Sequence, residues 1–364
     1  MRSLEQLIVP WIYKSAPYSS KHSDFAWNNP QIVRMMSNEN PHPPSQKILT
    51  AILEAAQQGQ FYPHSGEELR KKLSEKVGLS PNNVLLGNGS TDIIDIVVRT
   101  FVEAGDEVII SVPTFSMYQS RVNIAGGMPK LIPLTPDFNL DIPAIQKALN
   151  PRTKLIFVCS PNNPTGNQVP LEDLHKILEL GYPTFFDEAY LEFEEQPVTR
   201  VGMIRDYPLL MVNRTFSKAY GIAGLRLGYL FSEETLSSYF NRVRLPWNVN
   251  LLAIAAAIAA LDDENVSKKR DNILTERNIL YEKLNSIPGI RAIPSEGNFI
   301  LIDATSLGLS SAEISQRMIK RGYFIRPLDS HYGGEGFVRV TVSSIKNNQG
   351  FVDSFRDFVI EITA

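Results

Sequence analysis

The chain has 364 residues, 43% of them hydrophobic, which is long for one domain and enough for two packed domains with their own cores. Its 36 basic and 39 acidic residues leave a net charge of -3, so no overall field favours nucleic acid or an anionic membrane. The single cysteine, Cys159, lies in an apolar run and cannot form a disulfide within the chain, so we expect a buried thiol and a reducing, cytoplasmic compartment.

Residues 1–40 show neither helical nor strand periodicity and are expected to form an arm or lid that packs on protein. Glu5 and Pro10 interrupt the short apolar patch near the start, which argues against a targeting segment. The most apolar stretch, Leu251–Leu261, is about half as long as a bilayer span requires, so a buried helix is expected there.

Residues 41–231 predict a large α/β domain. A helix with an apolar face at Ile48, Ile52, Leu53 and Ala56 comes first, and a charged helix over Glu67–Val77 follows it. Short apolar runs then alternate with helical stretches. The expected strands are Val84–Leu86, Glu107–Val112, Leu131–Leu134, Leu155–Cys159, Thr184–Phe186, Leu209–Val212 and Leu227–Phe231, and the helices between them are Thr91–Glu103, Phe115–Ala125, Ile142–Leu149 and Leu171–Leu180. Apolar strands spaced by helices predict a mostly parallel sheet sandwiched by helices, in which ligands bind beyond the carboxyl ends of the strands.

The C-terminal part changes to long helices and predicts a smaller α+β domain. From residue 232 on, the expected helices are Glu233–Val243, which still belongs to the large domain, Asn250–Leu261, Glu264–Ile287, one opened by a capping box of Ser310 and Glu313, and a last one at the C-terminus. The expected strands are Asn298–Ile302, Tyr323–Arg326 and Phe337–Val342. We therefore expect an arm over residues 1–40, a large domain over 41–245 and a small domain over 246–364.

The candidate site begins with a lysine in a turn rich in hydroxyl groups. Lys218 follows an apolar strand, Thr215 and Ser217 flank it, and Arg226 stands at the start of the next strand. An amine of lowered pKa can form a Schiff base with an aldehyde cofactor, while hydroxyl groups and a guanidinium hold a phosphate on that cofactor. A lone lysine after a strand is ordinarily a surface residue, so the interpretation depends on the other strand ends.

Two earlier strand ends carry features that fit the same ligand. Gly89 lets a backbone approach closely, and Ser90 opens a helix whose free N–H groups attract phosphate, although the same features suit an ordinary turn. Phe115 follows the next strand and could stack on a planar ring or belong to the core.

The next two strand ends supply an amide and an acid. Asn163, in the turn C-S-P-N-N-P-T-G, has an amide that can donate into the cleft. Asp187, in F-F-D-E-A-Y, would be partly desolvated and calls for a cationic partner, which a protonated pyridine nitrogen would provide, while Tyr190 could reach the oxygen on the ring. A helix cap or a metal ligand are the alternatives for Asp187, but no second acid or histidine stands at metal-binding spacing.

From about Ser37 to the C-terminus, this order of residues resembles the fold-type I pyridoxal-phosphate enzymes, and within them the class I and II aminotransferases. Further motifs look like those of the histidinol-phosphate aminotransferases and their relatives: N-E-N-P-x-P-P, Y-P-x-x-G-x-x-x-L-R from Tyr62, V-C-S-P-N-N-P-T-G, F-D-E-A-Y-x-E-F, R-T-F-S-K-A-Y-G-I-A-G-L-R-L-G-Y, R-P-L and F-V-R-V-T-V.

The resemblance implies a fold-type I transferase that binds pyridoxal 5'-phosphate. Lys218 would bind the cofactor covalently, Asp187 would pair with the pyridine nitrogen, Asn163 and Tyr190 would bind the ring oxygen, and Phe115 would stack on the ring. The resemblance assigns the cofactor's phosphate to Gly89, Ser90, Thr91, Thr215, Ser217 and Arg226 with Tyr62 of a partner subunit in a homodimer, and the acidic group of the substrate to Arg339, Arg326 and Asn38.

The implied reaction is a ping-pong transamination of histidinol phosphate with 2-oxoglutarate, which gives imidazole-acetol phosphate and glutamate in histidine biosynthesis. The chain departs from the family pattern at Phe115, usually tyrosine, at Phe61, usually arginine, and at Val342–Ser344, usually isoleucine-glycine-threonine. These departures leave an aromatic or other amino-acid aminotransferase as an alternative. A threonine-phosphate decarboxylase or similar lyase would share every cofactor residue, whereas a DNA-binding regulator of this fold would need a helix-turn-helix that the chain does not show.

Overall fold

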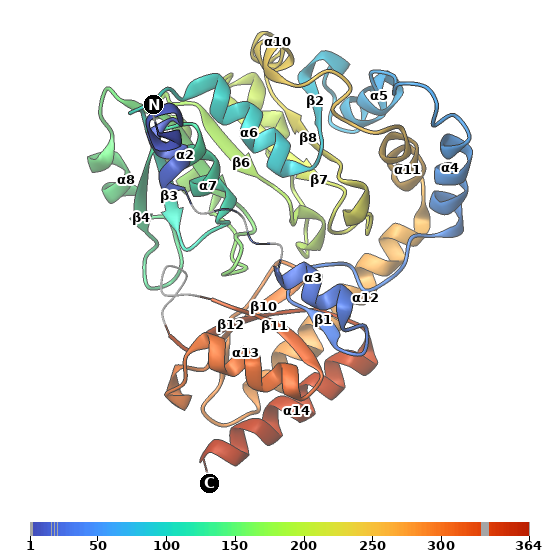
Figure 1. Cartoon of the computed structure of the whole chain (residues 1–364), viewed down its shortest axis with the longest axis vertical. Helices are drawn as coiled ribbons and strands as arrows, with labels where there is room; N and C mark the ends of the chain where they lie inside the picture. Colours follow the sequence, from blue (N-terminus) through green and yellow to red (C-terminus); the bar gives the residue numbers. More distant parts are fainter. Residues whose placement is uncertain (1–2, 16, 18, 20, 329–334, 364) are drawn as a thin grey trace.

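The computed structural model describes residues 3–15, 17, 19, 21–328 and 335–363 and places them around two β-sheets (Figure 1). Among these residues the larger sheet has seven strands, and only β8 runs against its neighbours. Their order is β2 (Val84–Gly87), β8 (Gly228–Phe231), β7 (Leu210–Thr215), β6 (Thr184–Asp187), β5 (Thr153–Cys159), β3 (Glu107–Val112) and β4 (Met128–Pro133). The mostly parallel sheet that the sequence predicts is therefore present.

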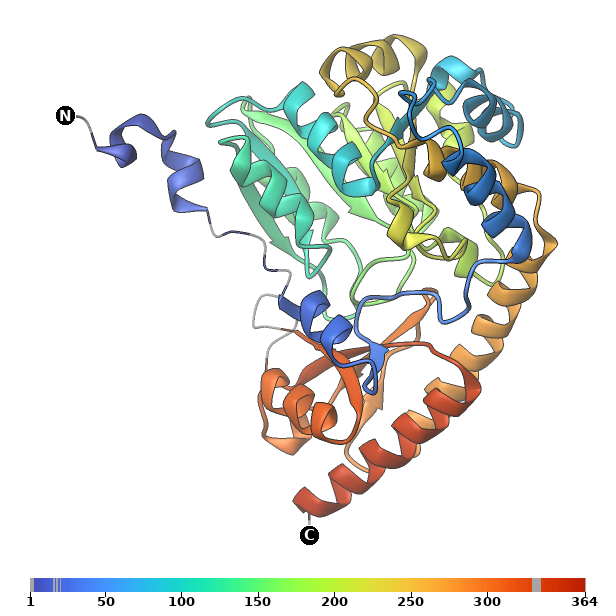
Figure 2. The ribbon, with the colours of Figure 1, turned by 45° about the vertical axis from the view of Figure 1, so that its right-hand side comes forward.

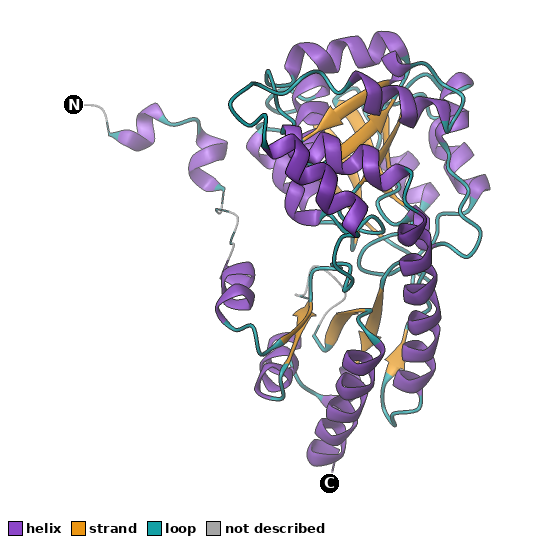
Figure 3. Cartoon of the chain, turned by 90° about the vertical axis from the view of Figure 1, so that its right-hand side faces the viewer, coloured by secondary structure: helices purple, strands orange, loops and turns teal. Residues whose placement is uncertain are grey.

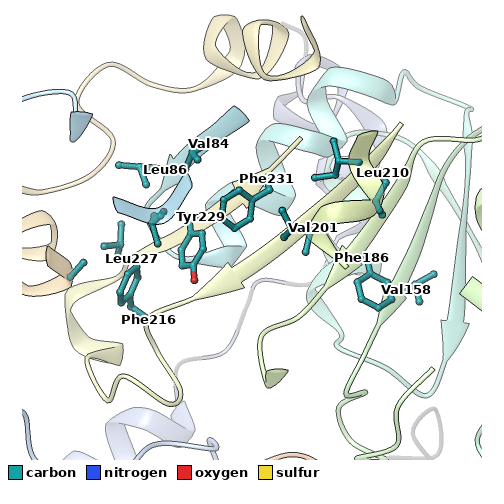
Figure 4. Close-up of a cluster of buried hydrophobic side chains, with 14 of the residues drawn as sticks. Val84, Leu86, Val158, Phe186, Val201, Leu210, Phe216, Leu227, Tyr229 and Phe231 are labelled. Carbon is teal, nitrogen blue, oxygen red and sulfur yellow. The ribbon is translucent and has the colours of Figure 1, made fainter. Parts of the chain in front are cut away.

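Helices cover both faces of the larger sheet (Figure 3) because its strands present apolar side chains to either side. Leu85 and Leu86, for example, join different buried clusters. One face packs against α6 (Ser90–Phe101), α7 (Met117–Ile124) and α10 (Glu234–Val243), and the other against α5 (Glu67–Glu75), α8 (Ile142–Ala148), α9 (Leu171–Leu178) and α11 (Leu251–Leu261). Figure 4 shows part of the second cluster, with Tyr229 and Phe231 on β8 and Phe186 on β6.

The smaller sheet contains five strands within the described part of the chain. Its order is β1 (Val33–Met35), β11 (Tyr323–Pro327), β12 (Phe337–Thr341), β10 (Phe299–Asp303) and β9 (Arg291–Ala292). It packs against α12 (Glu264–Asn285), α13 (Ser311–Lys320) and α14 (Ile345–Thr363). The predicted capping box of Ser310 and Glu313 opens α13. The long helix α12 runs from the large body to the small one (Figure 2).

Residues 1–40 show no periodicity in the sequence, yet the described part of this segment has regular structure. This segment contains α1 (Leu4–Leu7), α2 (Pro10–Lys14), α3 (Lys21–Asn28) and β1. These elements are too short for their periodicity to be read, and contacts distant in sequence stabilise two of them: β1 pairs with β11, and α3 contributes Ala26 to a small cluster with Phe324. α1 extends away from the main body (Figure 2), and α2 contacts α7 on its surface.

The apolar face expected on the first helix after the arm is confirmed only in part, because Ile48 and Ile52 pack against the core of the larger sheet and the other two residues are exposed. In α4 (Gln46–Ala56), which packs on α11, only Ile48 of the four predicted residues is buried, and Leu53 is 64% exposed. α4 meets the body of this chain along a narrow stripe, so its remaining apolar residues face outward.

The domain limits of 1–40, 41–245 and 246–364 remain a prediction, and their outermost residues lie outside the described part of the chain. α11 follows residue 245 but packs in the core of the larger sheet, and β1 precedes residue 41 but pairs with the smaller sheet. We propose a division that follows this packing, with the change from large to small domain inside α12. No helix of the described residues is long and apolar enough to span a bilayer.

Candidate active site

Asp187 lies at the carboxyl end of β6, in the middle of the larger sheet. Its register partners are Cys159 on β5 and Asn213 on β7. Oδ1 accepts hydrogen bonds from Asn213 Nδ2 at 2.8 Å and from the Ala189 backbone N–H at 3.1 Å, and Oδ2 accepts one from the Tyr118 hydroxyl at 2.6 Å. Burial raises the pKa of Asp187, and these three hydrogen bonds oppose that rise.

Lys218 lies in the turn after β7, and its Nζ donates a hydrogen bond to the Ser37 carbonyl at 2.9 Å. Burial lowers the pKa of Lys218 to about 7, and the positive charges of Arg339 and Arg226 contribute to the shift. An amine with this pKa is present to a large extent as the neutral nucleophile at neutral pH. The chemistry expected of Lys218 therefore fits its surroundings.

The arm passes through the site just before residue 40. Asn38 is 1% exposed, and its Nδ2 donates to the Tyr190 hydroxyl at 2.9 Å. Its own backbone N–H donates to Thr341 Oγ1 on β12 at 2.9 Å. Burial raises the pKa of Tyr190 to about 12, so the phenol stays protonated. Residues 37 and 38 thus contact both Lys218 and Tyr190.

Arg339 comes from β12 in the smaller sheet and reaches across to the larger domain, where its Nη1 donates to Asn163 Oδ1. Burial lowers the pKa of Arg339 to about 10, with a further contribution from the charge of Arg326, its register partner on β11. Arg339 Nε is buried without a hydrogen-bond partner among the described residues. An unpaired cationic donor in this place fits an anionic ligand.

A second anion position lies at the start of α6. Gly89 has a left-handed φ of 79°, and a Cβ there would collide with the Arg226 guanidinium. Thr215 on β7 and Gly228 on β8 are register partners beside this turn, and a Cβ on Gly228 would lie 2.7 Å from the Ser90 backbone N. Ser90 Oγ is buried without a partner in the described structure. Close backbones, a helix start and a guanidinium make this a fitting cradle for a phosphate.

The residues that the sequence predicts thus fall into one region, with one exception. Thr91 lies in the first turn of α6, Ser217 is buried next to Lys218, and the Phe115 ring lies edge-on to Tyr118 at 5.6 Å. Tyr62 lies outside the cluster, because it is 77% exposed and stacks on Trp247 at 4.3 Å. The donors and charges present fit pyridoxal phosphate: a neutral amine, a buried carboxylate and a phosphate cradle.

Two residues that contact Asp187 were not predicted from the sequence. Tyr118 stands three residues after Phe115, and a tyrosine inside a helical pattern indicates core packing. Asn213 has no exposed surface and stands in an otherwise apolar strand. A polar residue at such a position departs from the apolar pattern of the strand, and this departure could have identified it. Cys159, as expected, is buried, and burial raises its pKa.

Comparison with known proteins identifies the family. Residues 30–355 match the profile of "Aminotransferase class I and II". Histidinol-phosphate aminotransferase of Methanosarcina mazei is 40% identical over 329 residues, which cover 89% of this chain and 87% of the relative. The enzyme of that name from Moorella thermoacetica is 35% identical over 336 residues, with coverage of 90% and 86%.

Solved structures agree with this result. Histidinol-phosphate aminotransferase from Sinorhizobium meliloti, solved in complex with pyridoxal-5'-phosphate, superposes with a TM-score of 0.86 at 25% identity, and the match covers 98% of each chain. The fold-type I architecture expected from the sequence is confirmed. The chain therefore belongs to the aminotransferase class I and II family.

Proposed function

We propose that this aminotransferase uses pyridoxal phosphate to transfer the amino group of histidinol phosphate to 2-oxoglutarate. The proposal rests on one observation. The site has two separate positively charged positions where an anion can bind, one at Gly89 with Arg226 and one at Arg339. The first suits the phosphate of the cofactor, and the second is then left for the phosphate or carboxylate of a substrate. Two relatives that bear the histidinol-phosphate aminotransferase name, at 40% and 35% identity, support this donor.

Each residue has a role that follows from its surroundings. Pyridoxal phosphate supplies an aldehyde for the amino group and a ring that takes up the electrons of the breaking C–H bond. Lys218 Nζ, with its lowered pKa, accepts the proton from the α-carbon and returns it one atom along. Asp187 balances the charge of the protonated pyridine nitrogen, and Arg339 orients the anionic end of the substrate. We assign ring contacts to Phe115, Asn163 and Tyr190, phosphate contacts to Gly89, Ser90, Thr91, Thr215, Ser217 and Arg226 with the partner's Tyr62, and substrate contacts to Arg339, Arg326 and Asn38.

Uptake of pyridoxal phosphate by the apoprotein is expected to accelerate as the pH rises through about 7. The neutral amine attacks the aldehyde, and burial lowers the pKa of Lys218 to about 7 from its ordinary 10.5. Stopped-flow absorbance over a pH series measures the midpoint. Arg339→Gln removes a positive charge and should move the midpoint upward. A wild-type midpoint near 10.5 would show that Lys218 is not desolvated as described.

A panel of amino donors tests the substrate. Histidinol phosphate should give the highest kcat/KM with 2-oxoglutarate as acceptor. Brisk turnover of phenylalanine without turnover of histidinol phosphate would assign the chain to the aromatic aminotransferases instead. Release of carbon dioxide from threonine phosphate without consumption of a keto acid would assign it to the lyases.

The proposal includes a homodimer with shared active sites. Large apolar side chains are exposed on the arm, on α4 and around Trp247, beyond what a monomer normally leaves in water. Tyr62, next to Trp247, is free to enter a neighbouring site. Sedimentation should give twice the chain mass of 40.8 kDa, and a monomer at micromolar concentration would contradict this part. We also propose a cytoplasmic location, which cell fractionation tests.

A further inference from the structure

Tyr118 is a buried aromatic residue whose hydroxyl is directed at the carboxylate of Asp187. The residue has no exposed surface, and its hydroxyl donates to Asp187 Oδ2 at 2.6 Å. Its ring stacks on Phe157 with centroids 4.5 Å apart and an interplanar angle of 14°, and Phe115 and Phe185 pack edge-on against it. These rings hold Tyr118 in one orientation, so the direction of the hydroxyl is fixed by packing.

The surroundings determine which group donates. Burial, and then the charge of Asp187, raise the pKa of Tyr118 well above its ordinary value, so the phenol keeps its proton. In the described structure the hydrogen-bond donors to Asp187 are Tyr118, Asn213 and the Ala189 N–H, none of which is cationic. Neutral hydrogen-bond donors therefore stabilise the carboxylate, and the charge of Lys218 adds to their effect.

Asn213 shows the same arrangement on the other oxygen. Its Nδ2 donates to Asp187 Oδ1, while its own Oδ1 is buried without a partner among the residues that the structure describes. A flipped amide would place two oxygens against each other, so the orientation is set by the carboxylate. Leaving an acceptor unpaired in the core is unfavourable. The structure nevertheless has an unpaired acceptor next to Asp187, which indicates that the position of the carboxylate matters.

A carboxylate has about four acceptor positions, and three are occupied here, two on Oδ1 and one on Oδ2. We propose that Tyr118 is a positioning residue that keeps Asp187 ionised and turned so that the open position on Oδ2 receives the N–H of the cofactor's pyridine ring. This inference rests on the proposed function only in taking pyridoxal phosphate as the group that faces Asp187. It does not depend on which amino donor is used.

The test compares two cofactors on the apoprotein of Tyr118→Phe, which keeps the ring packing and removes the hydroxyl. Pyridoxal phosphate and its deaza analogue, in which C–H replaces the ring nitrogen, are titrated separately, with dissociation constants from absorbance. Both ligands carry the aldehyde and the phosphate, so only the ring nitrogen distinguishes them. The variant is expected to bind pyridoxal phosphate about tenfold more weakly than wild type and the analogue equally well, as for loss of a hydrogen bond to a charged group.

The matched control is Tyr229→Phe. Tyr229 is 1% exposed, packs among aromatic residues and is not among the hydrogen-bond donors to Asp187, so both dissociation constants should stay unchanged. Thermal unfolding of each apoprotein checks the fold. If Tyr118→Phe does not fold, Tyr118→Met, which fills the same apolar space, is titrated in the same way.

Equal weakening for both ligands would show a purely structural role for Tyr118 and overturn the inference, as would no weakening for either. A failure of the proposed function is recognised separately, because wild-type apoprotein would then bind neither ligand at Lys218.

Discussion

Lys218→Ala is expected to lower the rate of transamination by roughly 10⁴-fold, since proton transfer by a positioned group contributes about 10²–10⁴-fold and covalent attachment is lost as well. The amine that this change removes has a pKa of about 7 and lies near both anion positions. Among the described residues, three other lysines have a pKa that departs from the ordinary value: Lys72, Lys76 and Lys176. Neither Arg339 nor Arg226 is among the charges that shift the pKa of these three lysines. Single-turnover measurement of keto-acid formation gives the size of the loss.

Lys176→Ala serves as the matched control. This lysine lies on α9 and pairs with Asp173 at 2.9 Å, and the hydrogen bond to Asp173 raises its pKa. Its removal should leave kcat within about twofold, because exposed ion pairs contribute little to stability. If the two alanine variants retain equal activity, Lys218 is not the catalytic amine.

Asp187→Asn is expected to reduce kcat by about 10²–10³-fold, the usual effect of removing one preorganised electrostatic contact in an active site. The amide keeps nearly the shape of the carboxylate but cannot balance a protonated pyridine nitrogen. The new amide can keep its oxygen towards the Asn213 Nδ2 donor and turn its NH2 group towards the Tyr118 hydroxyl, so the local packing is retained and the negative charge is lost. Steady-state kinetics with saturating cofactor separates the loss in kcat from weaker cofactor binding.

Glu188→Gln, at the neighbouring position, is the control for that prediction. Glu188 is 1% exposed, and it accepts hydrogen bonds from Thr199 Oγ1 and the Arg200 backbone N–H. Its carboxylate faces structural partners, so the change should lower thermal stability and leave the pH dependence of kcat in place. A larger loss of kcat in Glu188→Gln than in Asp187→Asn would contradict the assignment of the ring nitrogen's partner.

The sequence predicts the strands of the larger sheet well because the evidence for them is local. Each apolar strand is followed directly by the residue that matters, as with Asp187 after Thr184–Phe186, and a parallel sheet brings those ends together. Lys218, Asn163 and Tyr190 converge in the structure for that reason. Arg339 stands 121 residues beyond Lys218 in sequence (339 − 218) and reaches the same site only through the packing of the small domain. The family resemblance indicated this role for Arg339, whereas the periodicity of the sequence could not.

What the sequence could not predict depends on contacts far apart in the chain. β1 has three residues and is a strand because Val33 pairs with Tyr323, 290 positions later (323 − 33). Tyr118 has the pattern of a core residue, and it becomes significant only because its hydroxyl meets Asp187. α4 shows apolar residues on more than one face, and a single chain leaves Leu53 exposed. The predicted role of Tyr62 in a partner's site stays a prediction for the same reason.

The central claim is a covalent attachment of pyridoxal phosphate at one lysine. Wild-type protein is incubated with pyridoxal phosphate, reduced with borohydride, digested and mapped by mass spectrometry. The account predicts one phosphopyridoxyl group per chain, carried by the peptide that contains Lys218. Label spread over surface lysines, with the Lys218 peptide unmodified, would contradict it.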